Sequence, residues 1–484
     1  MYLGLDLGTS GIRALLVNES GRPIAEASAP CTVTHPHPGW SEQDPAQWIK
    51  ACSTAMSALK ASHPAEVQSI KAIGLSGHMH GATLLDKDHN VLRPCMLWND
   101  TRSAVEAQEL DAQPIFRTLS GNIVFPGFTA PKVEWVRCHE PEIFAQIHKI
   151  LLPKDYLRFW LTGDCVSDMS DSAGTAWLDA DQRKWSSDLL SACALDFSQM
   201  PTLVEGSQAS GQLRSDLLSE WGVAGPVVVA GGGGDNAAAA CGLGCLAAGD
   251  GFVSLGTSGV LLAATDAYAP APEQAVHSFC HAIPDTWFQM GVTLAATDSL
   301  NWLAQIVNTT PAALDAALPH EPAGPSAAMF LPYLSGERTP HNDAKPSGVF
   351  AGLSIGASQE VLTAAVMEGV AFSLKDCLGA LRATGTKIDS LITTGGGTRS
   401  RYWLKTLATV LDLPLHVPTK GEFGAALGAA RLGMAAHLDG NNLDIMTKPA
   451  IAEIIEPKID LSDAYASRYG QYKALYPAVK SAMG

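Results

Sequence analysis

The chain has 484 residues, of which 46% are hydrophobic and 17% charged, and its formal net charge is −16. This length predicts two or more domains with separate hydrophobic cores. The acidic balance, with no basic stripe to offset it, excludes nucleic acid as a partner. No apolar run reaches the roughly 18 residues of a membrane span. The N-terminus enters a strand rather than a secretory signal, and the ten scattered cysteines fit reduced thiols, so we expect a cytoplasmic protein.

The first 17 residues predict two strands joined by a tight turn. The pentapeptide Leu-Gly-Thr-Ser-Gly at 7–11 forms this turn, with an apolar run on either side. Backbone N–H and hydroxyl groups in such a turn can bind phosphate oxygens. Asp6 precedes the turn, and a carboxylate beside a phosphate loop suggests a Mg²⁺ ion bound to a nucleotide. Because the negative protein repels ATP as a whole, local cations such as Arg13 have to assist.

The next elements alternate between strands and helices. A helix is expected from Asp44 to about Leu59, followed by strands at 70–75 and 82–85. Residues 100–220 are expected to be mainly helical, with breaks marked by prolines.

A polar turn at 76–81 separates those two strands. It contains His78 and His80, and no Cys/His cluster lies nearby in sequence, so zinc is disfavoured. Imidazole is a directional donor or acceptor, which favours recognition of sugar hydroxyls, although a solvent-exposed turn is the alternative. Trp98 and Asn99, at another strand end, could supply a stacking face and polar contacts.

Four consecutive glycines lead into the strongest catalytic candidate. The apolar run 226–230 predicts a buried strand, and Gly231–Asn236 follows it before an Ala-rich helix. Asp235 would then stand at the carboxyl end of a strand, where open α/β sheets place their sites. Asp is also a favoured helix cap, but a plain cap needs no run of glycines, so a catalytic role is preferred. A domain boundary is expected near 243–249.

The pentapeptide recurs at 255–259, with Ser254 in the place of Asp6. Recurrence in the same strand–turn–strand setting indicates duplication, and two such hairpins could hold one polyphosphate between two domains. A strand at 391–394 ends in Gly395-Gly396-Gly397, where either an adenosine or an ordinary tight turn would fit. A small-residue helix is expected at 422–436, packed closely on a sheet. The segment 330–338 is expected to be an ordered interdomain loop rather than a reactive one.

Together these segments resemble the FGGY carbohydrate kinases of the actin/hexokinase-like superfamily. The resemblance covers nearly the whole chain. It rests on GLDLGTSGIR at 4–13, PGFTAPKVEW at 126–135, LLPKDYLRFWLTG at 151–163, AGGGGDN at 230–236, SLGTSG at 254–259, LPYLSGERTPH at 331–341 and TTGGGTRSRYW at 393–403.

The resemblance implies an α/β fold of two ribonuclease-H-like domains, 1–245 and 246–484, with ATP and Mg²⁺ in the cleft between them. Asp235 would be the catalytic base and Asp6 the metal-associated carboxylate, and both would hold the metal through water. The implied ATP contacts are Thr9, Ser10, Gly11, Arg13, Gly256, Thr257, Gly395, Gly396 and Ser400. The implied sugar contacts are Met79, His80, Trp98, Asn99, Asp235 and Asn236.

Within this family, GHMHGATLL at 77–85 with LWND at 97–100 is most similar to the xylulokinases, which usually have Gln where His78 stands. This implies phosphorylation of D-xylulose to D-xylulose 5-phosphate. Another ketopentose or polyol (D-ribulose, L-xylulose or glycerol) and a non-catalytic sugar or nucleotide sensor are the alternatives. A Rossmann dehydrogenase is excluded because no G-x-G-x-x-G follows the first strand. The expected partners are a sugar and ATP, without a membrane, and a homodimer is allowed although the sequence leaves the oligomeric state open.

Overall fold

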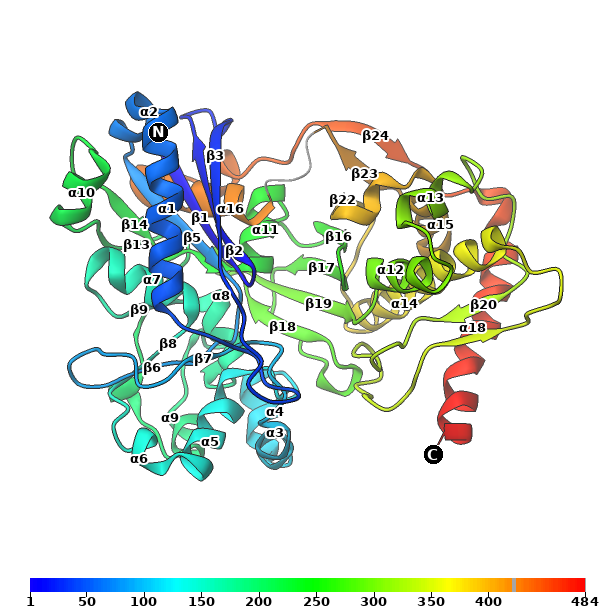
Figure 1. The fold of residues 1–484 in the computed structure, drawn as a ribbon, viewed down its shortest axis with the longest axis horizontal. Helices are drawn as coiled ribbons and strands as arrows, with labels where there is room; N and C mark the ends of the chain where they lie inside the picture. Colours follow the sequence, from blue (N-terminus) through cyan, green and yellow to red (C-terminus); the bar gives the residue numbers. More distant parts are fainter. Residues whose placement is uncertain (420–423, 484) are drawn as a thin grey trace.

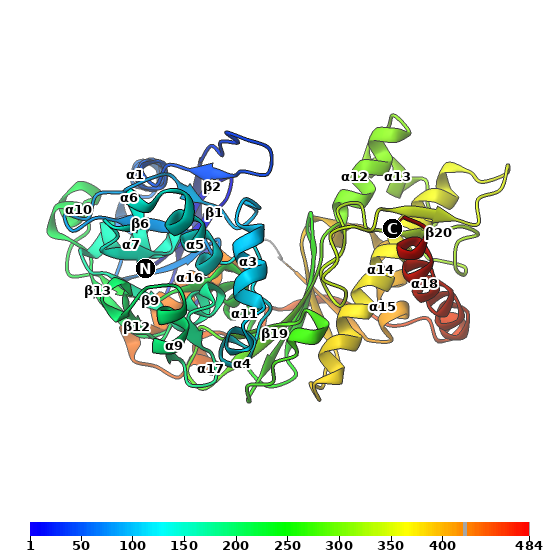
Figure 2. The same cartoon turned by 90° about the horizontal axis from the view of Figure 1, so that it is seen from below.

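The computed structural model describes residues 1–419 and 424–483, which form two lobes, each centred on a seven-stranded sheet. Figure 1 shows the N-terminal lobe on the left and the C-terminal lobe on the right. The lobes remain distinct in the perpendicular view (Figure 2). None of the helices in the described ranges is both long and apolar enough to span a bilayer. The architecture is therefore the mixed α/β arrangement expected from the sequence.

The N-terminal sheet has the order β13-β14-β5-β1-β2-β3, with β15 beside β5. Its first two strands are the predicted hairpin, which pairs antiparallel from Tyr2–Val17 to Gly8–Gly11 around a two-residue turn. β5 lies parallel to β1 on the other side, so Asp6 sits between Arg13 and Ser76 on neighbouring strands. The strands are β1 (Tyr2–Gly8), β2 (Gly11–Val17), β3 (Pro23–Pro30), β5 (Ala72–Gly77), β13 (Ala209–Gln212), β14 (Val228–Ala230) and β15 (Gly233–Gly234).

The C-terminal sheet has the order β18-β19-β17-β16-β22-β23-β24. The second pentapeptide also forms a hairpin, as predicted, but its pairing ends at Leu255–Gly259, so this turn has three residues. The carbonyls of Gly256 and Thr257 accept hydrogen bonds from the N–H groups at the start of α12, which holds the wider turn. The strands are β16 (Gly251–Leu255), β17 (Gly259–Thr265), β18 (His277–Cys280), β19 (Trp287–Thr293), β22 (Leu391–Thr394), β23 (Leu415–Pro418) and β24 (Ile451–Ile455).

Short strand pairs lie outside the two sheets, and several interrupt the segment 100–220. Helices nevertheless supply most of the regular structure of that segment, as the sequence led us to expect, and the strands in it are only two to four residues long. The pairs are β4 (Glu42–Gln43) with β7 (Cys95–Met96), β6 (Thr83–Leu85) with β8 (Lys149–Leu151), β9 (Val166–Asp168) with β12 (Thr202–Val204), β10 (Leu178–Asp179) with β11 (Lys184–Trp185), and β20 (Met329–Leu331) with β21 (Val349–Ala351).

Helices cover both sheets. In the first half of the chain they are α1 (Ala46–Ser62), α2 (Pro64–Gln68), α3 (Ala104–Asp111), α4 (Pro114–Ser120), α5 (Thr129–His139), α6 (Pro141–Phe144), α7 (Pro153–Thr162), α8 (Met169–Ser172), α9 (Ser187–Ala192), α10 (Ser215–Trp221) and α11 (Asp235–Leu243). In the second half they are α12 (Thr297–Ile306), α13 (Pro311–Ala316), α14 (Gln359–Ala383), α15 (Arg401–Leu411), α16 (Gly424–Leu438), α17 (Asn442–Ile445) and α18 (Ser462–Met483).

The predicted small-residue helix is α16, and it packs on the N-terminal sheet although it comes late in the chain (Figure 1). A Cβ on Gly4 of β1 would lie 2.0 Å from the carbonyl oxygen of Ala426, and one on Gly428 would lie 1.7 Å from that of Ala238. Glycine and alanine thus let α16 touch both β1 and α11 at backbone distance. The first two residues of the predicted helix, Glu422 and Phe423, lie outside the described residues. The division into 1–245 and 246–484 stays a prediction.

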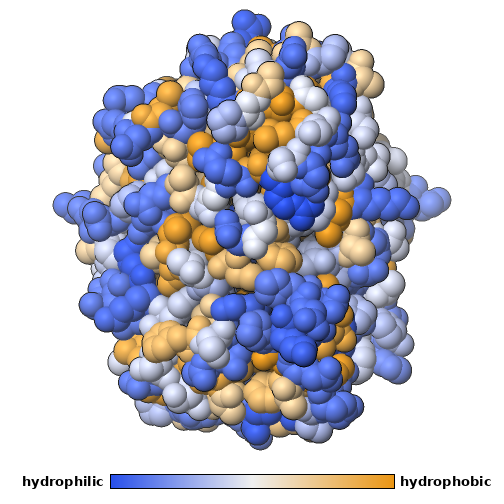
Figure 3. All heavy atoms as spheres, turned by 90° about the vertical axis from the view of Figure 1, so that its left-hand side faces the viewer, coloured by the Kyte–Doolittle hydropathy of each residue, from blue (hydrophilic) through white to orange (hydrophobic). Residues whose placement is uncertain are grey.

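The outer face of the N-terminal lobe mixes hydrophilic and apolar side chains. In Figure 3 the apolar ones form separate patches between hydrophilic ones rather than one continuous band. Such scattered apolar exposure is ordinary for a protein surface.

Candidate active site

The glycine run after β14 turns the chain into α11 and places Asp235 at the start of that helix. Gly232 has φ 74°, and a Cβ there would lie 2.3 Å from the carbonyl oxygen of Leu75, so only glycine fits. The N-cap position belongs to Gly234, not to Asp235. Instead, Oδ1 of Asp235 accepts hydrogen bonds from the N–H and the side-chain amide of Asn236, at 2.7 and 2.9 Å. The helix-cap alternative for Asp235 is therefore wrong.

Two carboxyl groups near this point have raised pKa values. Burial and the negative charge of Asp6 raise the pKa of Asp235 to about 6, although the donors of Asn236 lower it. Burial also raises the pKa of Asp6, against the Ser76 hydroxyl and the Arg13 cation. A carboxylate with a pKa near neutrality is well suited to accept a proton in catalysis. The negative charges of these two carboxylates repel each other, and carboxylate oxygens are hard ligands. The pair is therefore also suited to a divalent cation such as Mg²⁺.

A cavity of about 170 Å³ lies in front of Asp235. One water molecule needs about 10–15 Å³ of such cavity volume. The cavity is therefore large enough for a small organic molecule. Five of the six predicted sugar residues line it, namely Met79, His80, Trp98, Asp235 and Asn236. Asn99 is exposed and lies outside this lining, and its role as a sugar contact stays a prediction.

His80 is held in one orientation within the cavity wall. Its backbone has φ 71°, and its carbonyl accepts hydrogen bonds from Thr129 Oγ1 and Lys132 Nζ, at 3.2 and 3.0 Å. The ring stacks on Phe128, with 4.7 Å between centroids, and Nδ1 lies 2.7 Å from the carbonyl oxygen of Gly174. Because burial lowers the pKa of His80 to about 3, the ring is neutral, and Nδ1 must carry the hydrogen. Nε2 is then left as a hydrogen-bond acceptor for a ligand.

His78, at the position where xylulokinases usually have Gln, is not one of the residues that line the cavity. The side chain is buried, and neither ring nitrogen has a hydrogen-bond partner within the described residues. Burial lowers its pKa to about 3, so the ring is neutral, and it meets Trp48 edge-on at 5.8 Å.

Sequence reasoning missed the rest of the lining, which comes from both lobes. Arg338 in particular was expected to belong to a non-reactive loop, but it lines the cavity. Several of these residues lie in the PGFTAPKVEW and LPYLSGERTPH motifs. The sequence identified both motifs but predicted no sugar contact within them. The missed residues are Phe125, Gly127, Phe128, Ser258, Val260, His277, Met290, Val292 and Arg338.

A second cavity, of about 520 Å³, joins the first hairpin to the triple-glycine turn, and its lining includes Asp6, Arg13, Gly395 and Gly396. Gly395 has φ 90°, and a Cβ there would lie 2.7 Å from the carbonyl oxygen of Leu255. Only glycine therefore lets this turn touch the second hairpin.

The other predicted ATP contacts surround this cavity. Ser10 and Gly11 line a groove on the outer side of the first hairpin, together with Asp6 and Arg13. Thr9 Oγ1 accepts a hydrogen bond from Trp98 Nε1 at 3.1 Å, which links the hairpin to the first cavity. Gly256 and Thr257 line none of these cavities, and Thr257 is exposed at the tip of the second hairpin.

Ser400 lies in a neighbouring pocket of about 350 Å³, together with Gly396, Asn301 and Trp403. Its hydroxyl caps α15 by accepting the N–H of Trp403 at 3.1 Å and donates to Asp315. The side chain of Ser400 thus has a structural task at the edge of this pocket.

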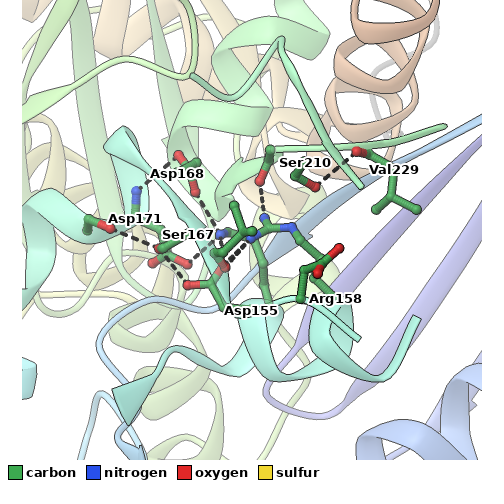
Figure 4. Close-up of polar contacts among 12 residues, drawn as sticks. Asp155, Arg158, Ser167, Asp168, Asp171, Ser210 and Val229 are labelled. Carbon is green, nitrogen blue, oxygen red and sulfur yellow. Dashed lines mark hydrogen bonds and ion pairs between the residues drawn. The ribbon is translucent and has the colours of Figure 1, made fainter. Parts of the chain in front are cut away.

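A buried ionic cluster contacts the glycine run, and Figure 4 shows Asp155, Arg158, Asp168 and Asp171 of this cluster. Lys154, Asp155, Arg158, Asp168 and Asp171 are all fully buried. Lys154 Nζ lies 2.5 Å from an oxygen of Asp155, 2.7 Å from Asp168 and 3.3 Å from Asp171. The three carboxylates are close enough to hold a metal ion, but the lysine ammonium already stands among them. A Mg²⁺ ion would therefore fit better beside Asp6 and Asp235, because within the described residues no lysine contributes to the pKa shift of either carboxyl.

The cluster is connected to the loop that carries Asp235. Arg158 donates to the carbonyl oxygen of Gly231, and the N–H of Gly234 donates to Ser170 Oγ at 3.2 Å. Ser170 Oγ in turn donates to Asp168. Both ends of the glycine run are thereby tied to buried charges.

The charges in the cluster do not balance, because three carboxyl groups face two cations. Burial raises the pKa of Asp171 well above its usual value, and the other two carboxylates raise it further against Lys154. Burial lowers the pKa of Lys154, but the three carboxylates outweigh it and raise this pKa overall. Lys154 is therefore charged, whereas the surroundings of Asp171 favour its protonated form.

Both the sequence and the fold of the chain match known proteins. Residues 1–242 match the N-terminal domain of the FGGY family of carbohydrate kinases, and residues 251–437 match its C-terminal domain. The chain is 47% identical to the xylulose kinase of Escherichia coli over 98% of each chain. It superposes on a crystal structure described as a "xyloylose kinase" from Brucella ovis with a TM-score of 0.98, at 58% identity over 99% of each chain. It also superposes on the xylulose kinase of Rhodospirillum rubrum with a TM-score of 0.92, at 29% identity over 100% of this chain and 99% of the other. The chain therefore belongs to the FGGY family of carbohydrate kinases.

Proposed function

We propose that this kinase transfers the γ-phosphoryl group of ATP to D-xylulose and forms D-xylulose 5-phosphate. The observation that carries the proposal is that one cavity, lined by residues of both lobes, contains Asp235 and His80. Asp235 has a pKa of about 6 and can accept a proton, and His80 offers an acceptor nitrogen. Similarity to relatives named xylulose kinase supports the choice of sugar.

In this mechanism Asp235 accepts the proton of the terminal sugar hydroxyl. The hydroxyl oxygen then forms a bond to the γ-phosphorus, and the bond from that phosphorus to the bridging oxygen of ADP breaks. Phosphoryl transfer involves little covalent chemistry by the protein, so positioning and electrostatics provide most of the rate.

The phosphates of ATP would lie where the first hairpin faces the triple-glycine turn, and Arg13 would offset part of their charge. Asp6 and Asp235 would hold Mg²⁺ through water, and the ion, when bound, neutralises negative charge on the phosphates. Trp98 would position the sugar next to this site, because its indole donates to Thr9 of the hairpin.

An ADP-release assay tests the proposal directly. Equal concentrations of D-xylulose, D-ribulose, L-xylulose and glycerol are compared by kcat/KM, with Asp235→Asn as the inactive control. We expect D-xylulose to give the highest value. A higher value for another sugar would change the substrate, whereas no ADP release with any of them would favour a sensor.

Two further features expected from the sequence stay predictions. The homodimer can be tested by light scattering after size-exclusion chromatography, and the cytoplasmic location by cell fractionation.

A further inference from the structure

We propose that Arg338, supplied by the C-terminal lobe, binds the C2 carbonyl oxygen of the acyclic ketose and so selects ketoses over polyols. This inference rests on the proposed function and deepens it by assigning a contact that determines which sugars are accepted.

The backbone on both sides of Arg338 is fixed. The Glu337 carboxylate is buried and accepts hydrogen bonds from Thr293 Oγ1, Ser373 Oγ and the N–H of Leu294, at 2.6, 2.8 and 2.9 Å. It also accepts the N–H of Arg338 at 2.8 Å.

On the other side, Thr339 is equally well held. Its N–H donates to the carbonyl of Val292 at 3.1 Å, and its hydroxyl donates to the carbonyl of Ala275 at 2.8 Å. Arg338 is therefore presented to the cavity from a rigid segment, which reduces the entropy lost when a ligand binds.

The guanidinium of Arg338 has no carboxylate partner in the part of the chain that the structure describes. The oxygens of Glu337 are occupied by the donors named above, and the Arg338 side chain instead lies over Phe125 of the N-terminal lobe, 4.9 Å from the ring centroid. Burial lowers the pKa of Arg338, although the charge of Glu337 raises it. An unpaired cation in a partly buried wall is costly unless a ligand supplies acceptor oxygens.

Arg338 lies close to His80 in the cavity wall, because it lies over Phe125, which packs at 5.5 Å against Phe128, the ring on which His80 stacks. Its positive charge contributes to lowering the pKa values of His80 and His277, after burial, the main cause. The pKa of Asp235, in contrast, responds to burial, to Asp6 and to Asn236. With the terminal hydroxyl at Asp235, we place the other end of the sugar beside the neighbouring Arg338 and His80.

The chemistry of the reaction determines what lies at that end. A 2-ketopentose closes its five-membered ring through the terminal O5, the same oxygen that would be phosphorylated. A sugar with O5 free therefore has a free ketone at C2, unless it is hydrated. A carbonyl oxygen only accepts hydrogen bonds, and arginine only donates them, whereas Nε2 of His80 accepts from a neighbouring hydroxyl. A polyol has a hydroxyl at C2 and gains less from a charged donor.

The test compares Arg338→Gln with wild type on D-xylulose and on xylitol, which has the same carbon chain but a hydroxyl at C2. Arg382→Gln is the matched control, because Arg382 lies at the end of α14 and donates to the carbonyl of Ile388. Thermal midpoints and circular dichroism establish that all variants are folded. Affinities come from calorimetry with a non-hydrolysable ATP analogue, and kcat/KM comes from ADP release.

We expect Arg338→Gln to lower kcat/KM for D-xylulose about 10- to 150-fold, the range for a lost charged hydrogen bond. Xylitol affinity should change less than about threefold, and neither the KM for ATP nor the control should change. Arg338→Lys should recover part of the loss. The proposal is overturned if affinity falls equally for D-xylulose and xylitol, or if kcat/KM for D-xylulose is unchanged. A rise in the KM for ATP of the same size as the loss for D-xylulose would assign Arg338 to the phosphates instead.

A spectroscopic readout separates this inference from the proposed function. D-xylulose labelled with ¹³C at C2 should give a bound ketone resonance that moves downfield in wild type and returns toward the free ketone in Arg338→Gln. A bound ring form would refute the carbonyl contact even if D-xylulose is the substrate. If wild type instead turns over a different ketose, the proposed substrate fails, and the same comparison with the corresponding polyol still tests Arg338.

Discussion

Replacing Asp235 with Asn should make the protein more stable while it removes the catalytic base. The pKa of this carboxyl rises from 3.8 to about 6 on folding, because burial and the charge of Asp6 disfavour its ionised form. The folded state therefore binds the proton more tightly than the unfolded state, and this contribution to stability is lost as the pH rises through about 6. Asparagine cannot ionise and avoids the loss.

The magnitude follows from the size of the shift. At pH 8 the ionised carboxylate costs up to about 3 kcal/mol, since one pKa unit corresponds to about 1.36 kcal/mol. At pH 5 much of the carboxyl is already protonated in the folded protein, and the cost falls to about 1.6 kcal/mol. The gain from Asp235→Asn should thus shrink by about 1.4 kcal/mol between pH 8 and pH 5. The cavity is open to water, so these values are upper limits.

Activity should change in the opposite direction. Gly234 is the N-cap of α11, so the substitution removes no cap. Loss of the base should lower kcat about 10²- to 10⁴-fold. In wild type, kcat/KM should fall as the pH drops below about 6, because the base becomes protonated, and this acid limb should be missing from the residual activity of the variant.

Urea unfolding at pH 5 and pH 8, followed by tryptophan fluorescence, measures the stability, and ADP release measures kcat. Asp6→Asn is the control for the repulsion, since it keeps the base but should move the acid limb to lower pH. A variant that is less stable than wild type at pH 8, or that keeps turnover within a few-fold, would refute the reasoning.

The remaining predictions concern the structures around Asp235. Asp171→Asn should cost less than Asp155→Asn, because burial and the neighbouring carboxylates favour the protonated form of Asp171, whereas Asp155→Asn breaks buried ion pairs and should cost about 3–5 kcal/mol; urea unfolding at pH 7 compares them, and equal costs would contradict this difference. His80→Ala should cost about 1–3 kcal/mol in kcat/KM for the sugar and leave the KM for ATP unchanged; an unchanged sugar value would place recognition elsewhere. Gly232→Ala should destabilise by at least about 1–2 kcal/mol, which thermal unfolding detects, and a stable variant would mean that this turn can relax.

The sequence alone was enough for features that depend on short stretches of chain. Both hairpins, the strand before the glycine run and the helix that begins at Asp235 follow from turn chemistry and apolar runs, which act over a few residues. The family followed from the same segments. The candidate sugar residues Met79, His80 and Trp98 could also be named, because they lie in such segments, and the structure gathers them around one cavity.

Only the tertiary structure decided which distant segments meet. Arg338 lines a cavity together with Phe125, which is more than 200 residues earlier in the chain. No local sequence pattern shows that the carboxylate oxygens of its neighbour Glu337 accept hydrogen bonds from other groups, such as Thr293. Likewise, α16 returns to the N-terminal sheet because its small residues permit backbone contact with β1. Lys154 becomes a buried counter-ion because folding brings Asp168 and Asp171 around it. Turn and strand preferences are local, whereas burial, charge pairing and cavity shape depend on contacts between residues far apart in sequence.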